Sequence, residues 1–239
     1  MASRYERDFS KGLVGTYAEV AAALLPHSKI LEIGCHSGDF TAYLSNLGHE
    51  VTGIESDAAA VQRAKQKGIE VIHLDVERIQ ASLAAHHQFD VILAMDVLEH
   101  LKEPSDVLRT LHPYLHPRGR LIVTGPNVAH WAVRKNLLLG RWEYTETGIM
   151  DRTHLRFYTR STWRRLLQDG GFRVIRMEPV DGSVPLGWLG VRMGLGTRLI
   201  DAGRSIMRRL VPDLFTIGFL MIAVPDMQNS ISAWRAAYR

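Results

Sequence analysis

Three carboxylates and one glycine-bearing turn have the residue types and spacing of a ligand site. Glu32 precedes the turn 34–38, Gly-Cys-His-Ser-Gly, while Glu55 and Asp75 each end a later apolar run. A turn of this kind brings backbone N–H groups against a ligand. Glu32 could accept an ammonium group, Glu55 could hold ribose hydroxyls and Asp75 could hold an adenine amino group. These residues together indicate a nucleotide-like ligand.

A second group of residues could act on a bound substrate. Asp96, Glu99 and His100 follow an apolar run, and His154 lies in the string Asp-Arg-Thr-His-Leu-Arg-Phe. Either histidine could remove a substrate proton as a general base. Alternatively, all four side chains could hold a divalent metal. In a third interpretation, Glu99 and His100 only orient the helix that follows.

These residues must be positioned by alternating strands and helices. Apolar runs predict strands at 29–33, 50–55, 70–74, 89–95, 120–124, 172–177 and 219–224. Helical patterns lie at 12–25, from the glycine turn to 47, and at 58–67, 79–85, 105–114 and 162–169. The expected N-caps are Asp57, Ser105 and either Thr159 or Ser161. The order predicts an α/β fold, a doubly wound and mostly parallel sheet whose strand ends share one crevice.

Length and composition predict one domain over residues 1–239. The chain is 46% hydrophobic and 23% charged, as in globular proteins with an ample core. Its single cysteine, Cys35, excludes an internal disulfide and a zinc site built from several cysteines. The N-terminus lacks a signal-peptide pattern, and the apolar run 214–224 is too short to span a bilayer. We therefore expect a cytoplasmic location, with a membrane-peripheral one as the alternative.

Charge is distributed unevenly along the chain. Residues 1–117 hold 10 basic and 16 acidic residues, whereas residues 118–239 hold 19 and 9, and 18 of those 19 are arginines. An arginine-rich half favours an anionic partner or a solvated surface. Residues 128–158 are expected to form a lid. The basic amphipathic insert 180–213 is expected to act as a lid, a homodimer contact or a membrane-surface helix.

Four segments resemble the class I S-adenosylmethionine-dependent methyltransferases. They are Leu-Glu-Ile-Gly-Cys-His-Ser-Gly (31–38), Val-Thr-Gly-Ile-Glu-Ser-Asp (51–57), Leu-Asp-Val-Glu (74–77) and Phe-Asp-Val-Ile-Leu-Ala-Met-Asp-Val-Leu-Glu-His-Leu (89–101). The resemblance implies a seven-stranded Rossmann-like sheet whose last strand inserts antiparallel between strands five and six, a reversed C-terminal hairpin. It also implies S-adenosyl-L-methionine as cofactor.

The resemblance assigns cofactor contacts to individual residues. It places Glu32 and Gly34 at the methionine part, Glu55 at the ribose, and Asp75 with Val76 at the adenine. The full expected set is Glu32, Gly34, Cys35, Gly38, Glu55, Ser56, Asp75, Val76, Met95 and Asp96. His36 replaces the family's middle glycine, so we expect its ring to point away from the cofactor.

The acceptor side resembles two branches of the superfamily. One is the ubiquinone-pathway O-methyltransferases; the other is the small-RNA 2′-hydroxyl methyltransferases, which bind a divalent metal through a similar motif. Asp96 is shorter than the glutamate usual there, so the metal is the less favoured alternative and Glu99, His100 and His154 are the expected catalytic residues.

We expect O-methylation of a small-molecule, glycan or lipid-linked acceptor. The alternatives are RNA ribose methylation and a non-catalytic cofactor-binding module. Two arginines, Arg152 and Arg156, could hold an anionic group of the acceptor. The aromatic residues expected to line the acceptor pocket are Trp131, Trp142, Tyr144, Phe157 and Tyr158.

Overall fold

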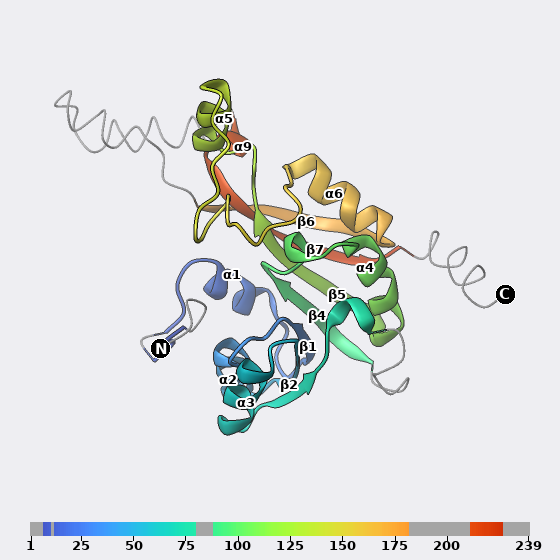
Figure 1. Ribbon diagram of the computed structural model, residues 1–239. Coiled ribbons are helices and arrows are strands. Elements are labelled where there is room, and N and C mark those ends of the chain that lie inside the picture. Colours follow the sequence, from blue (N-terminus) through green and yellow to red (C-terminus); the bar gives the residue numbers. More distant parts are fainter. Residues whose placement is uncertain (1–6, 11, 80–87, 182–210, 227–239) are drawn as a thin grey trace, which may run out of the picture.

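A computed structural model describes residues 7–10, 12–79, 88–181 and 211–226, and shows one seven-stranded sheet (Figure 1). The strand order is β3-β2-β1-β4-β5-β7-β6. The strands are β1 (Lys29–Ile33), β2 (Glu50–Glu55), β3 (Glu70–His73), β4 (Phe89–Met95), β5 (Leu115–Pro126), β6 (Phe172–Asp181) and β7 (Thr216–Pro225). The bounds of β1, β2 and β4 are those predicted.

The last strand, β7, runs antiparallel to the strands on both sides of it. β1 to β5 pair in parallel, whereas β7 pairs antiparallel with both β5 and β6. Ile122 of β5 lies opposite Ile222 of β7, for example. This confirms the predicted doubly wound sheet with a reversed C-terminal hairpin.

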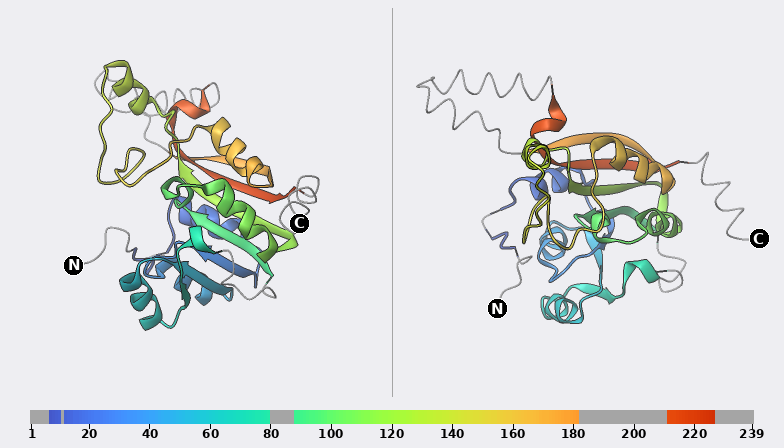
Figure 2. Two further views of the ribbon diagram at one scale, coloured as in Figure 1. Left: turned by 45° about the vertical axis from the view of Figure 1, so that its right-hand side comes forward. Right: turned by 45° about the horizontal axis from the view of Figure 1, so that its top comes forward.

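Helices cover both faces of the sheet (Figures 1 and 2). They are α1 (Thr16–Ala23), α2 (Asp39–Asn46), α3 (Ala58–Gln66), α4 (Pro104–Leu111), α5 (Trp131–Leu138), α6 (Arg160–Asp169) and α9 (Pro212–Phe215), with short 3-10 turns η1 (Val76–Arg78), η2 (Leu98–His100) and η3 (His112–Tyr114). Among the described helices, none combines the length and apolar character needed to cross a bilayer.

Alternating strand residues separate two cores. Ile30, Leu93 and Ile222 pack with α1 and α2 on one face. Leu31 and Ile92 pack with α4 and α6 on the other. Successive strand side chains point to opposite faces, so a strand covered on both sides is apolar throughout. This burial fixes where each strand ends, and therefore where the polar residues after it lie.

Several element boundaries differ from the predictions. α1 starts at Thr16 because Gly15 has a φ of 57°, which a helix cannot continue. The predicted cap Ser105 lies inside α4, which starts at Pro104 after Glu103. Thr159 does cap α6, with a complete capping box to Thr162.

The structure describes the first predicted insert throughout and the second only at its ends. Residues 128–158 contain α5 followed by an irregular loop. The ends of the 180–213 insert belong to β6 and α9, because β6 continues to Asp181 in its pairing with β7. Residues 182–210, and most of the helix predicted at 79–85, lie outside the described residues.

Candidate active site

A cavity of about 1090 Å³ runs along the carboxyl ends of β1, β2 and β4. Nine of the ten predicted cofactor residues line it: Glu32, Gly34, Cys35, Glu55, Ser56, Asp75, Val76, Met95 and Asp96. The three predicted catalytic residues, Glu99, His100 and His154, line it as well. The parallel strands thus bring both predicted groups to one space, as expected for this topology.

The glycine turn is tied to the next strand. Gly34 and Cys35 both donate their N–H groups to the Ile54 carbonyl, at 2.8 and 3.2 Å. His36 donates to Glu55 Oε2 at 2.9 Å, and Gly38 donates to the Cys35 carbonyl. These four N–H groups therefore have partners within the protein, contrary to the expectation that the turn offers its N–H groups to a ligand: three of them bond the end of β2, and the Gly38 N–H bonds within the turn.

The two glycines of the turn have different surroundings. Gly34 has a φ of 70°, and a Cβ there would lie 2.8 Å from Val97 Cγ2, so the close approach of β1 to Val97 requires glycine. A Cβ on Gly38 would instead meet Ala64 and Ile69 at 3.1 and 3.2 Å. Gly38 thus packs against α3 and does not line the cavity, and its cofactor contact stays a prediction.

Glu55 organises the junction between the glycine turn and β2. Besides His36 N–H, its carboxylate accepts the N–H groups of Ser56 and Asp57, each at 2.8 Å. His36 itself has a φ of 49°, its Nδ1 lies 3.2 Å from Ser37 Oγ, and it lines the cavity wall. The predicted orientation of its ring relative to a bound cofactor stays a prediction.

Glu32 is a buried carboxyl at the floor of the cavity. Its side chain is 5% exposed and accepts a 2.6 Å hydrogen bond from Thr41 Oγ1. Burial raises the pKa of Glu32 to about 7. Burial also raises the pKa of the Cys35 thiol far above its usual range, so this cysteine is not a reactive thiolate.

Asp75 and Asp96 reach the cavity from two other strand ends. Asp75 Oδ1 accepts the Glu77 N–H at 3.0 Å and so caps η1. Asp96 has a φ of 52°, an unusual conformation for a residue other than glycine that often marks functional sites. Its carboxyl bonds the Thr124 hydroxyl at 3.2 Å, and the low-dielectric walls of the cavity raise its pKa.

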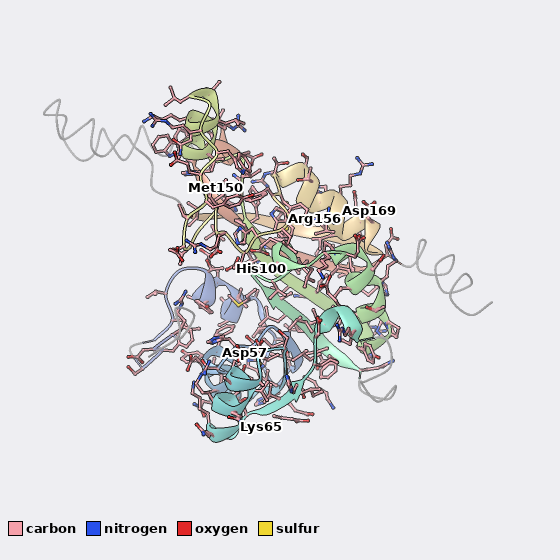
Figure 3. The ribbon with its side chains drawn as sticks, in the orientation of Figure 1. Asp57, Lys65, His100, Met150, Arg156 and Asp169 are labelled. Carbon is pink, nitrogen blue, oxygen red and sulfur yellow. The ribbon has the colours of Figure 1, made fainter. Side chains whose placement is uncertain are left out.

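The predicted catalytic residues form a compact cluster. One ligand atom from each of Glu99, His100 and His154 lies within 4.8 Å of the others, and the two imidazole centroids are 4.8 Å apart. The neighbourhood of His100 lies between the loop that carries Met150 and the lower half of the sheet (Figure 3). Asp96, the fourth residue of the weaker metal hypothesis, is not part of this cluster.

Glu99 lacks the hydrogen bonds that a buried carboxylate needs. Its side chain is 0% exposed, and within the described part of the chain neither oxygen accepts a hydrogen bond from another residue. Desolvation, followed by the nearby Asp96 and Asp151 charges, raises the pKa of Glu99 well above its usual value. Such a group usually marks a functional site.

Both histidines of the cluster are held by backbone carbonyls. His100 Nδ1 lies 3.1 Å from the Thr153 carbonyl, and His154 Nδ1 lies 3.1 Å from the Ile149 carbonyl. A carbonyl only accepts, so each Nδ1 donates to it, and Nε2 is the lone-pair atom of the neutral ring. This is the arrangement of histidines that take up a proton or bind a metal.

The acceptor side of the cavity differs from the prediction. Trp131, Trp142, Tyr144, Phe157 and Tyr158 do not line it. Arg152 pairs with Glu146, while Arg156 bonds the Lys102 carbonyl and lies 3.5 Å from Glu103. Trp142 and Tyr144 instead pack on Phe157, and Tyr158 packs on Trp163 of α6, so the predicted aromatic pocket is not what lines this cavity. The contact of Arg152 and Arg156 with an anionic acceptor stays a prediction.

Small and apolar residues line the acceptor side instead. They are Gly125, Pro126, Thr147, Gly148, Ile149, Val180, Ile217, Gly218 and Phe219. They come from β5, the loop after α5 and the hairpin β6–β7. No local motif marks them in the sequence; only the predicted insertion of the last strand beside β5 could have indicated β7.

The chain belongs to the family of methyltransferase domains, whose model matches residues 5–177. The ubiquinone biosynthesis O-methyltransferase of Caulobacter sp. (strain K31) is 29% identical over 166 residues, covering 66% of this chain and 62% of that protein. The mitochondrial enzyme of that name from Schizosaccharomyces pombe is 34% identical over 105 residues, or 40% of this chain and 37% of that protein. The chain therefore matches less than two thirds of the length of these relatives.

Solved structures share the fold. A SAM-dependent methyltransferase from Archaeoglobus fulgidus has a TM-score of 0.61 at 18% identity, covering 90% of this chain and 95% of that one. Magnesium protoporphyrin IX methyltransferase from Synechocystis PCC 6803 with bound S-adenosylhomocysteine has a TM-score of 0.57 at 19% identity, covering 88% and 82%. The predicted class I methyltransferase fold is thereby confirmed.

Proposed function

We propose that this chain is an S-adenosylmethionine-dependent O-methyltransferase acting on a hydroxyl of a small or lipid-linked acceptor. The observation that carries the proposal is one cavity that holds both the carboxylate set of β1, β2 and β3 and the cluster Glu99, His100 and His154. The relatives named for ubiquinone biosynthesis O-methylation support the choice of oxygen.

The cofactor would lie across the carboxyl ends of the strands. When bound, S-adenosylmethionine supplies an electrophilic methyl group on a sulfonium. Glu32 would hold its ammonium, Glu55 its ribose hydroxyls, and Asp75 with Val76 its adenine. The buried position of Glu32 makes this interaction strong, because an ion pair is screened less where water is excluded.

The acceptor hydroxyl must lose its proton as the methyl group is transferred. One nitrogen of His100 and one of His154 lie within 4.8 Å of each other on the cavity wall, and either ring could take the proton. The apolar wall formed by Ile149, Ile217 and Phe219 would position the body of the acceptor and exclude water.

The cluster also fits a divalent cation. One carboxylate and two imidazoles, each imidazole oriented by a carbonyl, form a common ligand set for such ions. The buried Glu99 carboxylate, which accepts no hydrogen bond from another residue in the described ranges, gains a counter-ion in this arrangement. A bound cation would lower the pKa of the acceptor hydroxyl.

Titration calorimetry with S-adenosylhomocysteine, followed by a mass-detected screen of phenolic and quinol acceptors, tests the function. We expect saturable cofactor binding and an acceptor that gains one CH₂ per turnover. Absence of cofactor binding at millimolar concentration would refute the proposal. Binding without any methylated product would favour the non-catalytic alternative.

One variant and one metal experiment test the acceptor side of the cavity. His154→Ala should lower turnover strongly and leave S-adenosylhomocysteine affinity nearly unchanged, because His154 lies on the acceptor side. Chelation followed by addition of Mg²⁺, Mn²⁺ or Zn²⁺ then distinguishes the general base from the cation. Recovery of activity only with a metal would select the cation, and activity indifferent to chelation would select the base.

A further inference from the structure

The buried acid Asp151 lies on the acceptor side of the cavity but has no part in the proposed methyl transfer. Its side chain is 4% exposed, and it lines the same cavity as His100 and His154. It begins the string Asp-Arg-Thr-His that ends at His154. A buried carboxyl is costly unless hydrogen bonds satisfy it, so its partners indicate why it is there.

Asp151 closes a tight turn over residues 151–154. Its carbonyl accepts the His154 N–H at 3.0 Å, and its carboxylate oxygen Oδ1 accepts the Thr153 N–H at 2.9 Å. The same oxygen accepts a hydrogen bond from the Thr153 hydroxyl at 2.7 Å. Aspartate and asparagine favour such turns, because their short side chains reach the N–H group two residues further on. The backbone and the side chain of Thr153 are therefore both held by Asp151.

The turn supplies the carbonyl that orients His100. The Thr153 carbonyl lies 3.1 Å from His100 Nδ1. This carbonyl belongs to the same peptide group as the His154 N–H, which bonds the Asp151 carbonyl. One peptide group is thus fixed by Asp151 on one side and holds the His100 ring on the other. Because a hydrogen bond weakens steeply when its angle changes, a rotation of this group would release the ring.

The second histidine has a carbonyl partner of its own. His154 Nδ1 lies 3.1 Å from the carbonyl of Ile149. The next residue, Met150, accepts the Thr145 N–H at 2.8 Å, and its place above His100 is visible in Figure 3. The ring of His154 therefore has a contact that the Asp151 side chain does not make, and it serves as an internal comparison for His100.

The loop also has anchors that do not use the Asp151 side chain. The N–H groups of residues 155–156 bond the Glu99 carbonyl at 2.9 and 3.0 Å. These bonds hold the loop on η2 when the carboxyl of Asp151 is removed. What that carboxyl adds is the fixed position of Thr153, whose carbonyl faces His100.

We propose that Asp151 is a positioning residue for His100, acting through the Thr153 carbonyl. It keeps the neutral His100 ring in the form with its proton on Nδ1, so that Nε2 is left to take a substrate proton or to bind a cation. The acceptor oxygen of Asp151 does this, and not its charge. The consequence for catalysis rests on the proposed function, whereas the position of the ring proton does not.

Histidine-selective ¹⁵N labelling of the full chain, freed of metal by chelation, tests the proposal. Long-range ¹H–¹⁵N spectra at about pH 8, above the ordinary pKa of histidine, report which ring nitrogen carries the proton. The variants His100→Gln and His154→Gln assign the two signals among the 11 histidines. We expect the Nδ1–H form of both rings in the wild type. In Asp151→Ala, His100 should become a mixture of the two forms, and His154 should change less.

Two further variants grade the effect. Asp151→Asn keeps an oxygen that accepts both Thr153 hydrogen bonds and should restore the wild-type signal of His100. Thr153→Val removes only the hydroxyl bond and should shift that signal less than Asp151→Ala does. Turnover should follow the same order and fall about tenfold or more in Asp151→Ala, since a misplaced general base loses part of its contribution. As a control, Thr159→Ala removes the cap of α6 and should leave the His100 signal unchanged.

Calorimetry with S-adenosylhomocysteine on every variant shows that the rest of the cavity is intact. Failure of the wild type to bind it would refute the proposed function and leave the spectra as the test of the turn. A wild-type His100 without the Nδ1–H form would overturn the proposal, as would an Asp151→Ala variant with the wild-type signal. An Asp151→Asn variant that behaves like Asp151→Ala would overturn it too. If Asp151→Ala does not fold, an unshifted His100 signal in Thr153→Val would have the same meaning.

Discussion

Several residues at the cavity are in unfavourable environments or conformations. Glu32 and Glu99 are carboxyls at 5% and 0% exposure, and burial raises the pKa of both. Asp96 has a backbone conformation that is unfavourable for a side chain. A folded protein keeps such unfavourable features where a ligand or the surrounding structure offsets their free energy. Substitution of these residues is therefore the direct test of the site.

Glu32 should make folding and cofactor affinity depend on pH in opposite directions. Its pKa of about 7 exceeds the ordinary value of 4.5, so the folded state binds this proton more tightly than the unfolded state. Stability is then highest below about pH 4.5 and falls as pH rises through 7, by roughly 3 kcal/mol. S-adenosylhomocysteine affinity should rise through the same range, because the charged carboxylate binds the ammonium.

Glu32→Gln should remove both dependences and weaken S-adenosylhomocysteine by about tenfold, as one charge-assisted hydrogen bond is lost. Melting curves and calorimetry between pH 5 and about 8, a range that spans the shifted pKa, measure this. Glu70→Gln, at an exposed position, serves as the control. If the stability or the affinity of the Glu32→Gln variant still changed with pH, another titratable group would be responsible.

Glu99→Gln should raise the melting temperature of the metal-free protein by a few degrees and abolish turnover. The amide removes a desolvated charge, while the cluster loses its one carboxylate ligand for a cation. Differential scanning calorimetry of chelated samples, with an activity assay, measures both effects. A lower melting temperature of the Glu99→Gln variant would mean that the protein already stabilises the Glu99 carboxylate.

At the scale of elements, the packing of α6 on β5 fixes the floor of the acceptor side. Trp163 is fully buried, and its Nε1 donates to the Pro126 carbonyl at 2.8 Å. A Cβ on Gly125 would lie 2.1 Å from Trp163 Cζ2. The strand can therefore approach the helix only with glycine at this position.

Gly125→Ala should destabilise the fold by about 3 kcal/mol, because the methyl group overlaps the indole ring. Denaturant unfolding measures this free energy. The same substitution in a Trp163→Phe background should cost less, since the smaller ring leaves room. Equal costs in the two backgrounds would show that the backbone of β5, and not the ring, opposes the methyl group.

At the scale of the molecule, one cavity joins the turn after β1, the ends of β2, β3 and β4, and the loop after α5. A ligand that fills it binds only the folded state, so it stabilises the whole domain. At a concentration 100-fold above its Kd, S-adenosylhomocysteine should add about 2.7 kcal/mol.

Asp75→Ala should reduce that ligand-dependent increment without unfolding the protein, because it removes the proposed adenine contact and only one cap of the short turn η1. Thermal shifts with and without S-adenosylhomocysteine measure it. Thr159→Ala removes the cap of α6, away from the cavity, and should lower stability while keeping the full increment. An unchanged increment in Asp75→Ala would remove Asp75 from the adenine site.

The sequence by itself determined the sheet and the carboxylate set. Continuous apolar runs require burial on both faces, so β1, β2 and β4 have the predicted bounds. Parallel strands with short connections then require Glu32, Glu55 and Asp75 to meet at one edge. These features depend on local periodicity and on chain direction, which the sequence carries.

Only the tertiary structure decided how the acceptor side is built. The Glu99 carbonyl accepts the N–H groups of Leu155 and Arg156, at 2.9 and 3.0 Å, and this irregular pairing brings His154 beside His100. The same loop turns Trp142 and Tyr144 outward. Such contacts join residues more than 50 positions apart with no repeating pattern, so their geometry follows from packing and hydrogen bonding in the folded chain.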